Sequence, residues 1–285
     1  MIRADKLSYT YAAATTPAIT GLDFHIAPGE IFGFLGPSGA GKSTTQKILI
    51  GLLKDFDGEA TVLGKSVRDW RSDFYERIGV SFEVPNLYGK LTGVENLTYF
   101  GSLYSGPIRT PAELLEAVGL DAADGELLVS QYSKGMRNRL NVARSLLHYP
   151  DLLFMDEPTA GLDPVNARRV KELIKAQRTA GKTVFLTTHD MTVADELCDR
   201  VAFIVDGRIS RIDSPQELKQ QFGSRTVRVE FSENGGVRRS EFPLDGLGAN
   251  EAFLKLVREA DIRTIHTQEA TLEEIFIQVT GRSLA

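Results

Sequence analysis

The chain has 285 residues, a formal net charge of −5 and a pI near 5.5, so it lacks the strongly basic balance expected of a nucleic-acid-binding protein. Hydrophobic residues make up 42% and charged residues 25%, as in ordinary globular proteins, and no apolar run approaches the roughly 18 residues of a spanning helix. One cysteine excludes an internal disulfide framework, and the N-terminal segment lacks the apolar core of a signal peptide, which favours the cytoplasm.

The first clear pattern is a short apolar run that ends at a glycine. The stretch GEIFGFLG, residues 29–36, is nearly continuous in apolar residues, as is typical of a strand buried in a parallel sheet. Residues 42–53 follow with apolar side chains at the spacing of one helical face. A strand, a glycine-rich loop and a helix in this order predict the start of a β-α-β unit.

The middle of the chain has a different pattern. Between residues 85 and about 149 no comparable strand occurs, and the segments 92–105, 110–120 and 136–149 have helical character. We therefore expect a helical insertion at about 85–149 within the domain that contains the sheet.

Three apolar runs that predict further strands follow this insertion. They are DLLFMDE at 151–157, TVFLTTH at 183–189 and VAFIVDG at 201–207, and helical segments at 165–179 and 192–198 separate them. The alternation of strands and helices predicts an α/β fold with a parallel sheet that helices cover on both faces.

After residue 223 the pattern changes again. TVRVEF at 226–231 alternates between apolar and polar residues, NEAFLKLVREA is amphipathic, and TLEEIFIQV at 271–279 places its apolar residues on one helical face. We predict one domain over residues 1–222 and a small α+β extension over residues 223–285.

The loop GPSGAGKST, residues 36–44, matches the phosphate-binding pattern G-x-x-x-x-G-K-[ST]. Its glycines allow the backbone to form a concave nest of N–H groups, and the following helix adds the positive end of its dipole. Lys42 supplies a charge for the β- and γ-phosphates, and the Ser43 hydroxyl is a ligand for Mg²⁺. The alternative is a chance match, which the flanking strand and helix disfavour. The expected nucleotide contacts are Gly36, Ser38, Gly39, Ala40, Gly41, Lys42, Ser43 and Thr44.

Two carboxylates follow the strand predicted at 151–157. Ligands bind at the C-terminal edge of open parallel sheets, so Asp156 and Glu157 are expected there. Asp156 is a candidate for the Mg²⁺ shell, whereas Glu157 points in another direction and can polarise a water molecule. The alternative is a solvated acidic turn, which the phosphate loop upstream makes the weaker interpretation.

Taken together, these motifs resemble the ATP-binding subunit of an ABC transporter over about residues 1–220. GPSGAGKST corresponds to the Walker A loop, LLFMDE to Walker B, YSKGM at 132–136 to the signature motif, and AGLD at 160–163 to the D-loop. His189 matches the switch histidine. The resemblance implies a P-loop NTPase fold of the RecA type with ATP and Mg²⁺ as ligands.

The resemblance also implies roles for individual residues in ATP hydrolysis. Glu157 is expected to act as the base that polarises water, and His189 to contact the γ-phosphate and orient that water. Lys42 stabilises charge on the phosphates, and Asp163 of the D-loop joins the nucleotide contacts. Tyr11 resembles the aromatic residue that stacks on adenine, and the nearby Tyr9 is the alternative.

In this family two ATP-binding domains meet head to tail. Ser133, Lys134 and Gly135 in the signature of one domain then face the ATP held by the Walker A loop of the other. The alternative is that Ser133 merely caps a helix. We expect a second ATPase domain, plausibly an identical copy, and a separate membrane permease that holds the chain at the cytoplasmic face of the membrane; nucleic acid is not an expected partner.

Three residues depart from the pattern of the family, one before the helical insertion and two in the signature. Glu83 occupies the position of the usual glutamine, and we expect it to touch the Mg²⁺ shell as an additional metal and nucleotide contact. The alternative is an exposed glutamate with no role in nucleotide binding. In the signature, Lys134 replaces a small residue and adds positive charge beside the anion site, and Met136 replaces a polar residue.

The C-terminal stretch TLEEIFIQVTGR, Glu83 and the SKGM signature resemble ATPases of the ABC-2 type export group, which handles drugs, lipids and polysaccharides. We therefore expect an ATPase that powers export. Two alternatives stay open, an uptake ATPase and a non-transport ATPase of the same fold. We expect the substrate to bind the permease and not this chain.

Overall fold

The computed structural model of the chain describes residues 1–223, 226–233, 236–268 and 270–283. The chain divides into two units, one over Met1–Ser214 together with Ser283, and one over Pro215–Arg282. The division into domains at residues 222 and 223 stays a prediction.

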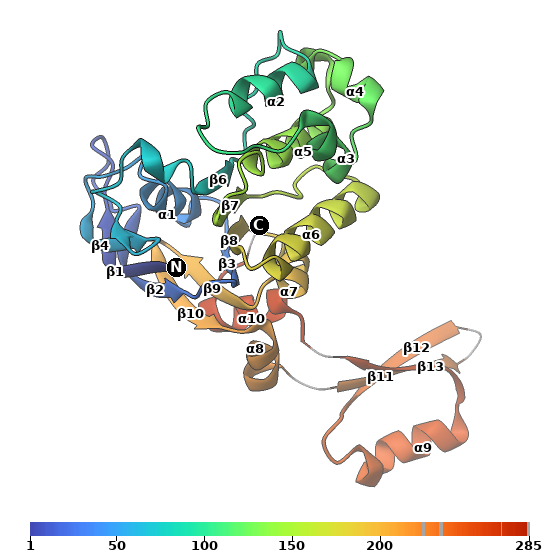
Figure 1. The fold of residues 1–285 in the computed structure, drawn as a ribbon. Helices are drawn as coiled ribbons and strands as arrows, with labels where there is room; N and C mark the ends of the chain where they lie inside the picture. The colour runs from blue at the N-terminus through green and yellow to red at the C-terminus, as the bar shows by residue number, and fades with distance from the viewer. Residues whose placement is uncertain (224–225, 234–235, 269, 284–285) are drawn as a thin grey trace. The chain divides into compact units, whose positions relative to one another are not determined.

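The first unit is built around a six-stranded sheet whose neighbouring strands come from distant parts of the sequence (Figure 1). Five strands run parallel, and β10 pairs antiparallel with β9 at one edge. In order across the sheet the strands are β10 (Arg208–Asp213), β9 (Arg200–Val205), β3 (Ile31–Leu35), β8 (Thr183–Thr188), β7 (Leu152–Asp156) and β6 (Ile78–Ser81). Every residue of β3, β7 and β8 is buried, which explains their continuous apolar runs. The predicted α/β fold is confirmed.

Helices cover the two faces of this sheet. On one face α6 (Pro164–Thr179) and α7 (Met191–Leu197) pack against β8, and α7 also packs against β3. On the other face Leu49 of α1 (Lys42–Leu49) joins a large buried apolar cluster that includes phenylalanines of β3 and β8. The helix ends at Leu49 and not at residue 53 as its apolar spacing predicted, because Gly51 adopts a left-handed φ of +77°.

The close approach of α7 to β3 depends on a glycine. A Cβ at Gly33 would lie 2.7 Å from the sulfur of Cys198, which directly follows α7. The Cys198 side chain is buried, and this burial raises the pKa of its thiol.

A second sheet, four-stranded and antiparallel, packs against α1. It was not predicted from the sequence. Its strands, in order, are β2 (Ile19–Ile26), β1 (Ile2–Tyr9), β4 (Asp57–Val62) and β5 (Lys65–Ser66). The backbone N–H of Thr20 donates to the carbonyl of Gly207 (2.8 Å), which joins β2 to the turn between β9 and β10. This sheet brings the segment after β1 to the phosphate loop.

Four helices lie between β6 and β7. They are α2 (Gly93–Gly101), α3 (Pro111–Val118), α4 (Ala122–Glu126) and α5 (Lys134–Ser145). Capping boxes begin α2 and α3, with Thr92 paired to Glu95 and Thr110 paired to Glu113. The expected helical character of this segment is observed.

The second unit contains a small sheet and three helices. Strands β12 (Gly236–Pro243), β11 (Thr226–Glu233) and β13 (Asp261–Gln268) form an antiparallel sheet in that order, and α8 (Pro215–Phe222), α9 (Glu251–Glu259) and α10 (Leu272–Thr280) complete the unit. Buried residues of β11 pack with residues of α9 in a separate apolar cluster. Among the described helices of the whole chain, none has both the length and the apolar character needed to cross a membrane.

Candidate nucleotide site

The loop Gly36–Gly41 connects β3 to α1, and the last residues of the motif, Lys42–Thr44, form the first turn of that helix. Gly39 and Gly41 have φ values of +80° and +106°, which residues with a Cβ rarely adopt. A Cβ at Gly36 would lie 2.1 Å from the carbonyl oxygen of Ile204, so the loop begins in direct contact with β9. The glycines therefore allow both the curvature of the loop and its close packing on the sheet.

Lys42, the first residue of α1, is folded back into this loop. Its ammonium donates hydrogen bonds to the carbonyl oxygens of Gly36 (2.5 Å) and Pro37 (3.0 Å). Burial lowers the pKa of Lys42, and the charges of Glu157 and Asp156 partly oppose this shift. The ammonium is thus held inside the loop, where phosphate oxygens can replace the two carbonyl acceptors.

Asp156 ends β7 and faces Ser43 at the start of α1. Its Oδ2 atom lies 3.5 Å from the Ser43 hydroxyl, and Thr187 of β8 donates to its other oxygen. Burial raises the pKa of Asp156, and the negative charges of Glu83 and Glu157 act in the same direction. Removing a proton from this carboxyl therefore becomes more favourable when a cation binds beside it.

The oxygens of Ser43 and Asp156 are the hard ligands that Mg²⁺ prefers. Among the described residues no group of three or more His, Cys, Asp or Glu side chains could hold a metal by itself. A metal bound here would therefore complete its shell with phosphate and water oxygens, which fits the way Mg²⁺ is held with nucleotides.

Glu157 is fixed more tightly than any neighbouring acid of the site. Its Oε1 atom accepts a hydrogen bond from the backbone N–H of His189 (2.8 Å) and lies 2.6 Å from Nδ1 of the same residue. Its Oε2 atom accepts from the Thr188 hydroxyl (2.9 Å). The residue also has a φ of +48°, an uncommon value for a residue other than glycine, asparagine or aspartate. Both carboxylate oxygens are therefore oriented before any ligand binds.

A pocket of about 420 Å³ gathers most of the residues that the sequence singled out. Tyr11 lines it, and the Tyr11 hydroxyl lies 3.2 Å from the Thr44 hydroxyl. Tyr9 packs edge-on against the ring of Tyr11, with centroids 4.9 Å apart. The lining residues are Tyr11, Ala18, Ser38, Gly39, Gly41, Lys42, Ser43, Thr44, Glu83, Asp156, Glu157 and His189.

Six of the predicted site residues do not line this pocket. Gly36 and Ala40 belong to the loop itself but contribute no lining surface. Ser133, Lys134 and Gly135 lie at the start of α5, where the Ser133 hydroxyl accepts from the Met136 N–H (3.1 Å).

Asp163 is the sixth of these residues, and it lies at the start of α6. Its carboxylate accepts hydrogen bonds from the N–H groups of Val165 and Asn166. Both Ser133 and Asp163 therefore cap helices in the single chain.

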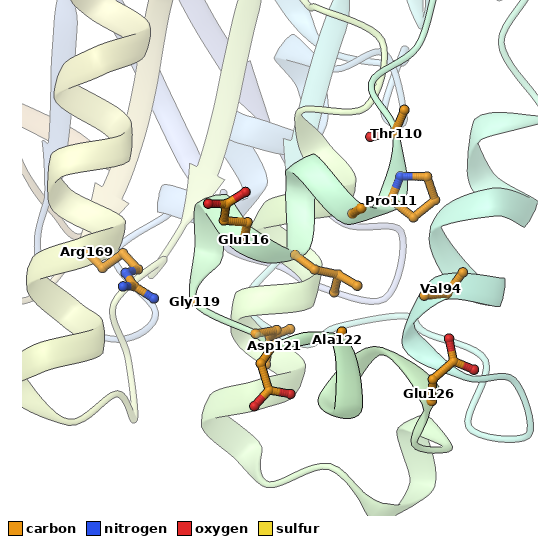
Figure 2. Close-up of a pocket in the computed structure, with 12 residues that line it drawn as sticks. Val94, Thr110, Pro111, Glu116, Gly119, Asp121, Ala122, Glu126 and Arg169 are labelled. Carbon is orange, nitrogen blue, oxygen red and sulfur yellow. The ribbon is translucent and has the colours of Figure 1, made fainter.

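A second and larger hollow, of about 710 Å³, lies among the helices (Figure 2). Figure 2 shows Val94 of α2 at one end and Arg169 of α6 at the other, with Glu116 of α3 between them. Its lining contains none of the predicted nucleotide contacts, so it is distinct from the phosphate pocket in spite of its size.

Two residues of the site were missed by the sequence analysis. Thr187 orients Asp156, and Thr188 orients Glu157, from the end of the neighbouring strand β8. The only signal was the pair of polar residues that ends the apolar run TVFLTTH.

Residues 19–160 match the family model described as ABC transporter, and residues 225–269 match the model described as fluoroquinolone efflux ABC transporter C-terminal domain. The fluoroquinolones export ATP-binding protein of Mycobacterium tuberculosis is 56% identical over 285 residues, which cover 100% of this chain and 94% of that protein. The chain belongs to the ABC transporter family. It is an ATP-binding subunit with the ATPase fold of that family.

Other relatives of this ABC subunit agree. The daunorubicin/doxorubicin resistance ATP-binding protein DrrA of Streptomyces peucetius is 35% identical, over 93% of this chain and 88% of that protein. The Nod factor export ATP-binding protein I of Paraburkholderia xenovorans is also 35% identical, over 99% of this chain and 98% of that protein. The predicted resemblance to ATP-binding subunits of export systems is confirmed.

A solved structure supports the same conclusion for the fold and the ligand. The dimeric structure of a post-hydrolysis state of the ATP-binding cassette MJ0796 bound to ADP and Pi has a TM-score of 0.69 and 28% identity. It covers 75% of this ABC subunit and 98% of the cassette. The chain is accordingly an ATPase, as the sequence predicted.

Proposed function

We propose that this ABC subunit hydrolyses Mg-ATP at the pocket beside the phosphate loop and so powers export of a fluoroquinolone-like drug through a separate membrane permease. The observation that carries the proposal is the convergence of Lys42, Ser43, Asp156, Glu157 and His189 on one 420 Å³ pocket. A positive charge, two oxygen ligands and an oriented carboxylate are the groups that phosphoryl transfer to water requires.

The residues of the pocket have separate tasks in this proposal. Lys42 and the amides of the loop bind the phosphates, and the Tyr11 ring stacks on adenine. Ser43 and Asp156 hold Mg²⁺, with Glu83 near its shell; bound there, the ion neutralises charge on the phosphates.

Glu157 accepts a proton from the attacking water. Its two oxygens are held from His189 and Thr188, so the water it orients has a defined position. His189 also reaches the γ-phosphate, since 59% of its side chain is exposed at the mouth of the site.

The signature residues act in a second copy. Ser133, Lys134 and Gly135 lie outside the pocket of their own chain, at a helix N-terminus whose amides attract anions. Two copies that meet head to tail would place this helix over the γ-phosphate bound by the partner, with Asp163 at the same seam. Two dimeric structures of the cassette MJ0796, one of them bound to ADP and Pi, support this arrangement.

The substrate and the location follow from the relatives in the same proposal. A relative 56% identical along the full chain is named for fluoroquinolone export, and the C-terminal segment matches a model named for fluoroquinolone efflux. We assign the chain to the cytoplasmic face of the membrane, where ATP is available and a permease would bind it.

Two measurements test the proposal. The purified chain should hydrolyse ATP, and Glu157→Gln should lower turnover by about 10²–10⁴-fold while it retains ATP binding and dimerises with ATP. Cells that express the chain with its permease should accumulate less fluoroquinolone than cells in which the chain carries Glu157→Gln. Equal accumulation in the two strains would reject the substrate, and unchanged turnover would reject the catalytic assignment.

A further inference from the structure

The outer edge of β12 has no partner strand. The sheet of the second unit runs β12-β11-β13, and no strand in the described part of the chain pairs with the far side of β12 (Figure 1). Such an edge presents a row of backbone N–H and C=O groups that can pair with another chain. Natural proteins protect edges of this length or use them.

The side chains on one face of β12 are complementary to the same face of a second β12 strand that runs antiparallel to it. Along the strand that face carries Val237, Arg239, Glu241 and Pro243, because alternate residues share a face. In an antiparallel pair of two β12 strands centred on Ser240, Arg239 faces Glu241 and Val237 faces Pro243. Opposite charges and apolar groups therefore meet at every position of that face.

The existing ion pairs extend this pattern across the sheet. Arg228 of β11 donates twice to Oε1 of Glu241 (2.9 and 2.7 Å), and Arg239 donates from Nε to Glu230 (2.7 Å). A second copy would add its own Arg239 beside Glu241, so that charge alternates from strand to strand across four strands. Like charges would not be directly opposite at any step.

Atoms suited to these contacts remain unused in the single chain. Among the described residues, none donates a hydrogen bond to Oε2 of Glu241 or accepts one from the two terminal nitrogens of Arg239. The Arg239 side chain is 68% exposed and that of Glu241 is 51% exposed, even though both are already in ion pairs. The two groups can therefore bind a partner without breaking the contacts that they have.

We propose that the second unit dimerises through β12, which pairs antiparallel with β12 of a second copy about a two-fold axis at Ser240 and forms one six-stranded sheet. The two-fold axis makes each Arg239–Glu241 contact occur twice. This association needs no nucleotide, unlike the ATP-bound dimer proposed above. It keeps two ATPase units near each other between cycles and raises their effective concentration.

The test is sedimentation velocity of the full chain without nucleotide over a range of concentrations. The wild type should show a reversible monomer–dimer equilibrium, and Arg239→Glu should weaken it about tenfold or more, because two attractive contacts become repulsive. Glu230→Gln is the matched control, since it removes the internal partner of Arg239 and leaves the edge unchanged. Arg263→Glu applies the same charge change to β13. Neither control should alter the equilibrium.

A charge-swapped variant tests the register. Combining Arg228→Glu, Glu230→Arg, Arg239→Glu and Glu241→Arg keeps every internal and intermolecular pair opposite in sign. This variant should self-associate like the wild type but fail to mix with it, as measured by energy transfer between labelled chains.

Several results would overturn the proposal. They are a chain that stays monomeric without nucleotide at about 100 μM, an equilibrium that responds to Arg263→Glu and not to Arg239→Glu, and free mixing of swapped and wild-type chains. ATP-dependent dimerisation of Glu157→Gln would survive any of these results, so the two proposals fail separately.

Discussion

His189 contacts the same oxygen of Glu157 twice, through its backbone N–H at 2.8 Å and through ring Nδ1 at 2.6 Å. The histidine follows β8 and the glutamate follows β7, so neighbouring parallel strands bring the two residues together. The backbone contact holds the carboxylate in place. The ring contact links the orientation of the carboxylate to a side chain that is exposed at the mouth of the pocket. The two contacts can be separated by mutation.

Replacing His189 by alanine removes the ring and keeps the backbone hydrogen bond to Glu157. We expect ATP turnover to fall by about 10–10³-fold, because the carboxylate stays in place while the water and γ-phosphate lose a contact. Phosphate release at saturating Mg-ATP measures the change. In the Glu157→Gln background the same replacement should have a much smaller effect, since both residues act on one water. Additive losses would contradict this coupling.

Glu83→Gln should keep ATP turnover within about fivefold of the wild type. Glu83 adds negative charge beside Lys42 and Asp156, so the neutral amide should weaken attraction for Mg²⁺ and leave the phosphate contacts intact. Titration of turnover with Mg²⁺ should show a higher half-saturating concentration. An inactive variant with unchanged Mg²⁺ dependence would argue against a role near the metal.

Asp156→Asn should raise the free energy of unfolding of the nucleotide-free chain by about 1 kcal/mol at pH 8, because it removes a buried charge. The raised pKa of Asp156 means that its ionisation costs stability at high pH, and that this cost disappears as the pH falls below the pKa of an ordinary aspartate. In denaturant unfolding, the advantage of the variant should therefore shrink as the pH is lowered from 8 towards the pKa of an ordinary aspartate. Turnover should be lost, because the amide is a poor ligand for Mg²⁺.

Gly36→Ala should destabilise the chain by about 2–4 kcal/mol and abolish nucleotide binding. Its Cβ would lie 2.1 Å from the carbonyl oxygen of Ile204, so β3 and β9 must move apart. Gly39→Ala in the same loop is the control. There a Cβ meets nothing within 4 Å and only the left-handed φ is strained, at a cost of about 1 kcal/mol. Equal losses in denaturant unfolding would rule out the steric explanation.

The sequence predicted those strands that consist of a continuous run of apolar residues. Continuous apolar runs marked β3, β7 and β8, because strands buried on both faces need no polar alternation. The antiparallel sheet was missed because it is half buried and interrupted. Its strand β1 has register shifts after Ala4 and after Leu7, which break the alternation expected of a strand.

The sequence predicted the site residues that directly follow strands. It did not predict the contacts that hold these residues in place. Thr187 and Thr188 lie in β8 and orient the two acidic residues at the end of β7. The sequence alone does not show that these two strands are neighbours. The inward fold of Lys42 onto two carbonyls likewise depends on the curvature of the loop and not on a motif. The exposed pattern of β12 became visible only when the order of the sheet left that strand at an edge.

The buried sulfur of Cys198 also has a practical consequence. It is the only thiol in the 285 residues, and its high pKa and its packing against Gly33 shield it from alkylating reagents while the chain is folded. A cysteine engineered at an exposed position such as Val165, which is 77% accessible, would take a fluorophore or spin label selectively. Distance measurements on assembling copies can then begin from the natural background, with no cysteine-free variant to make first.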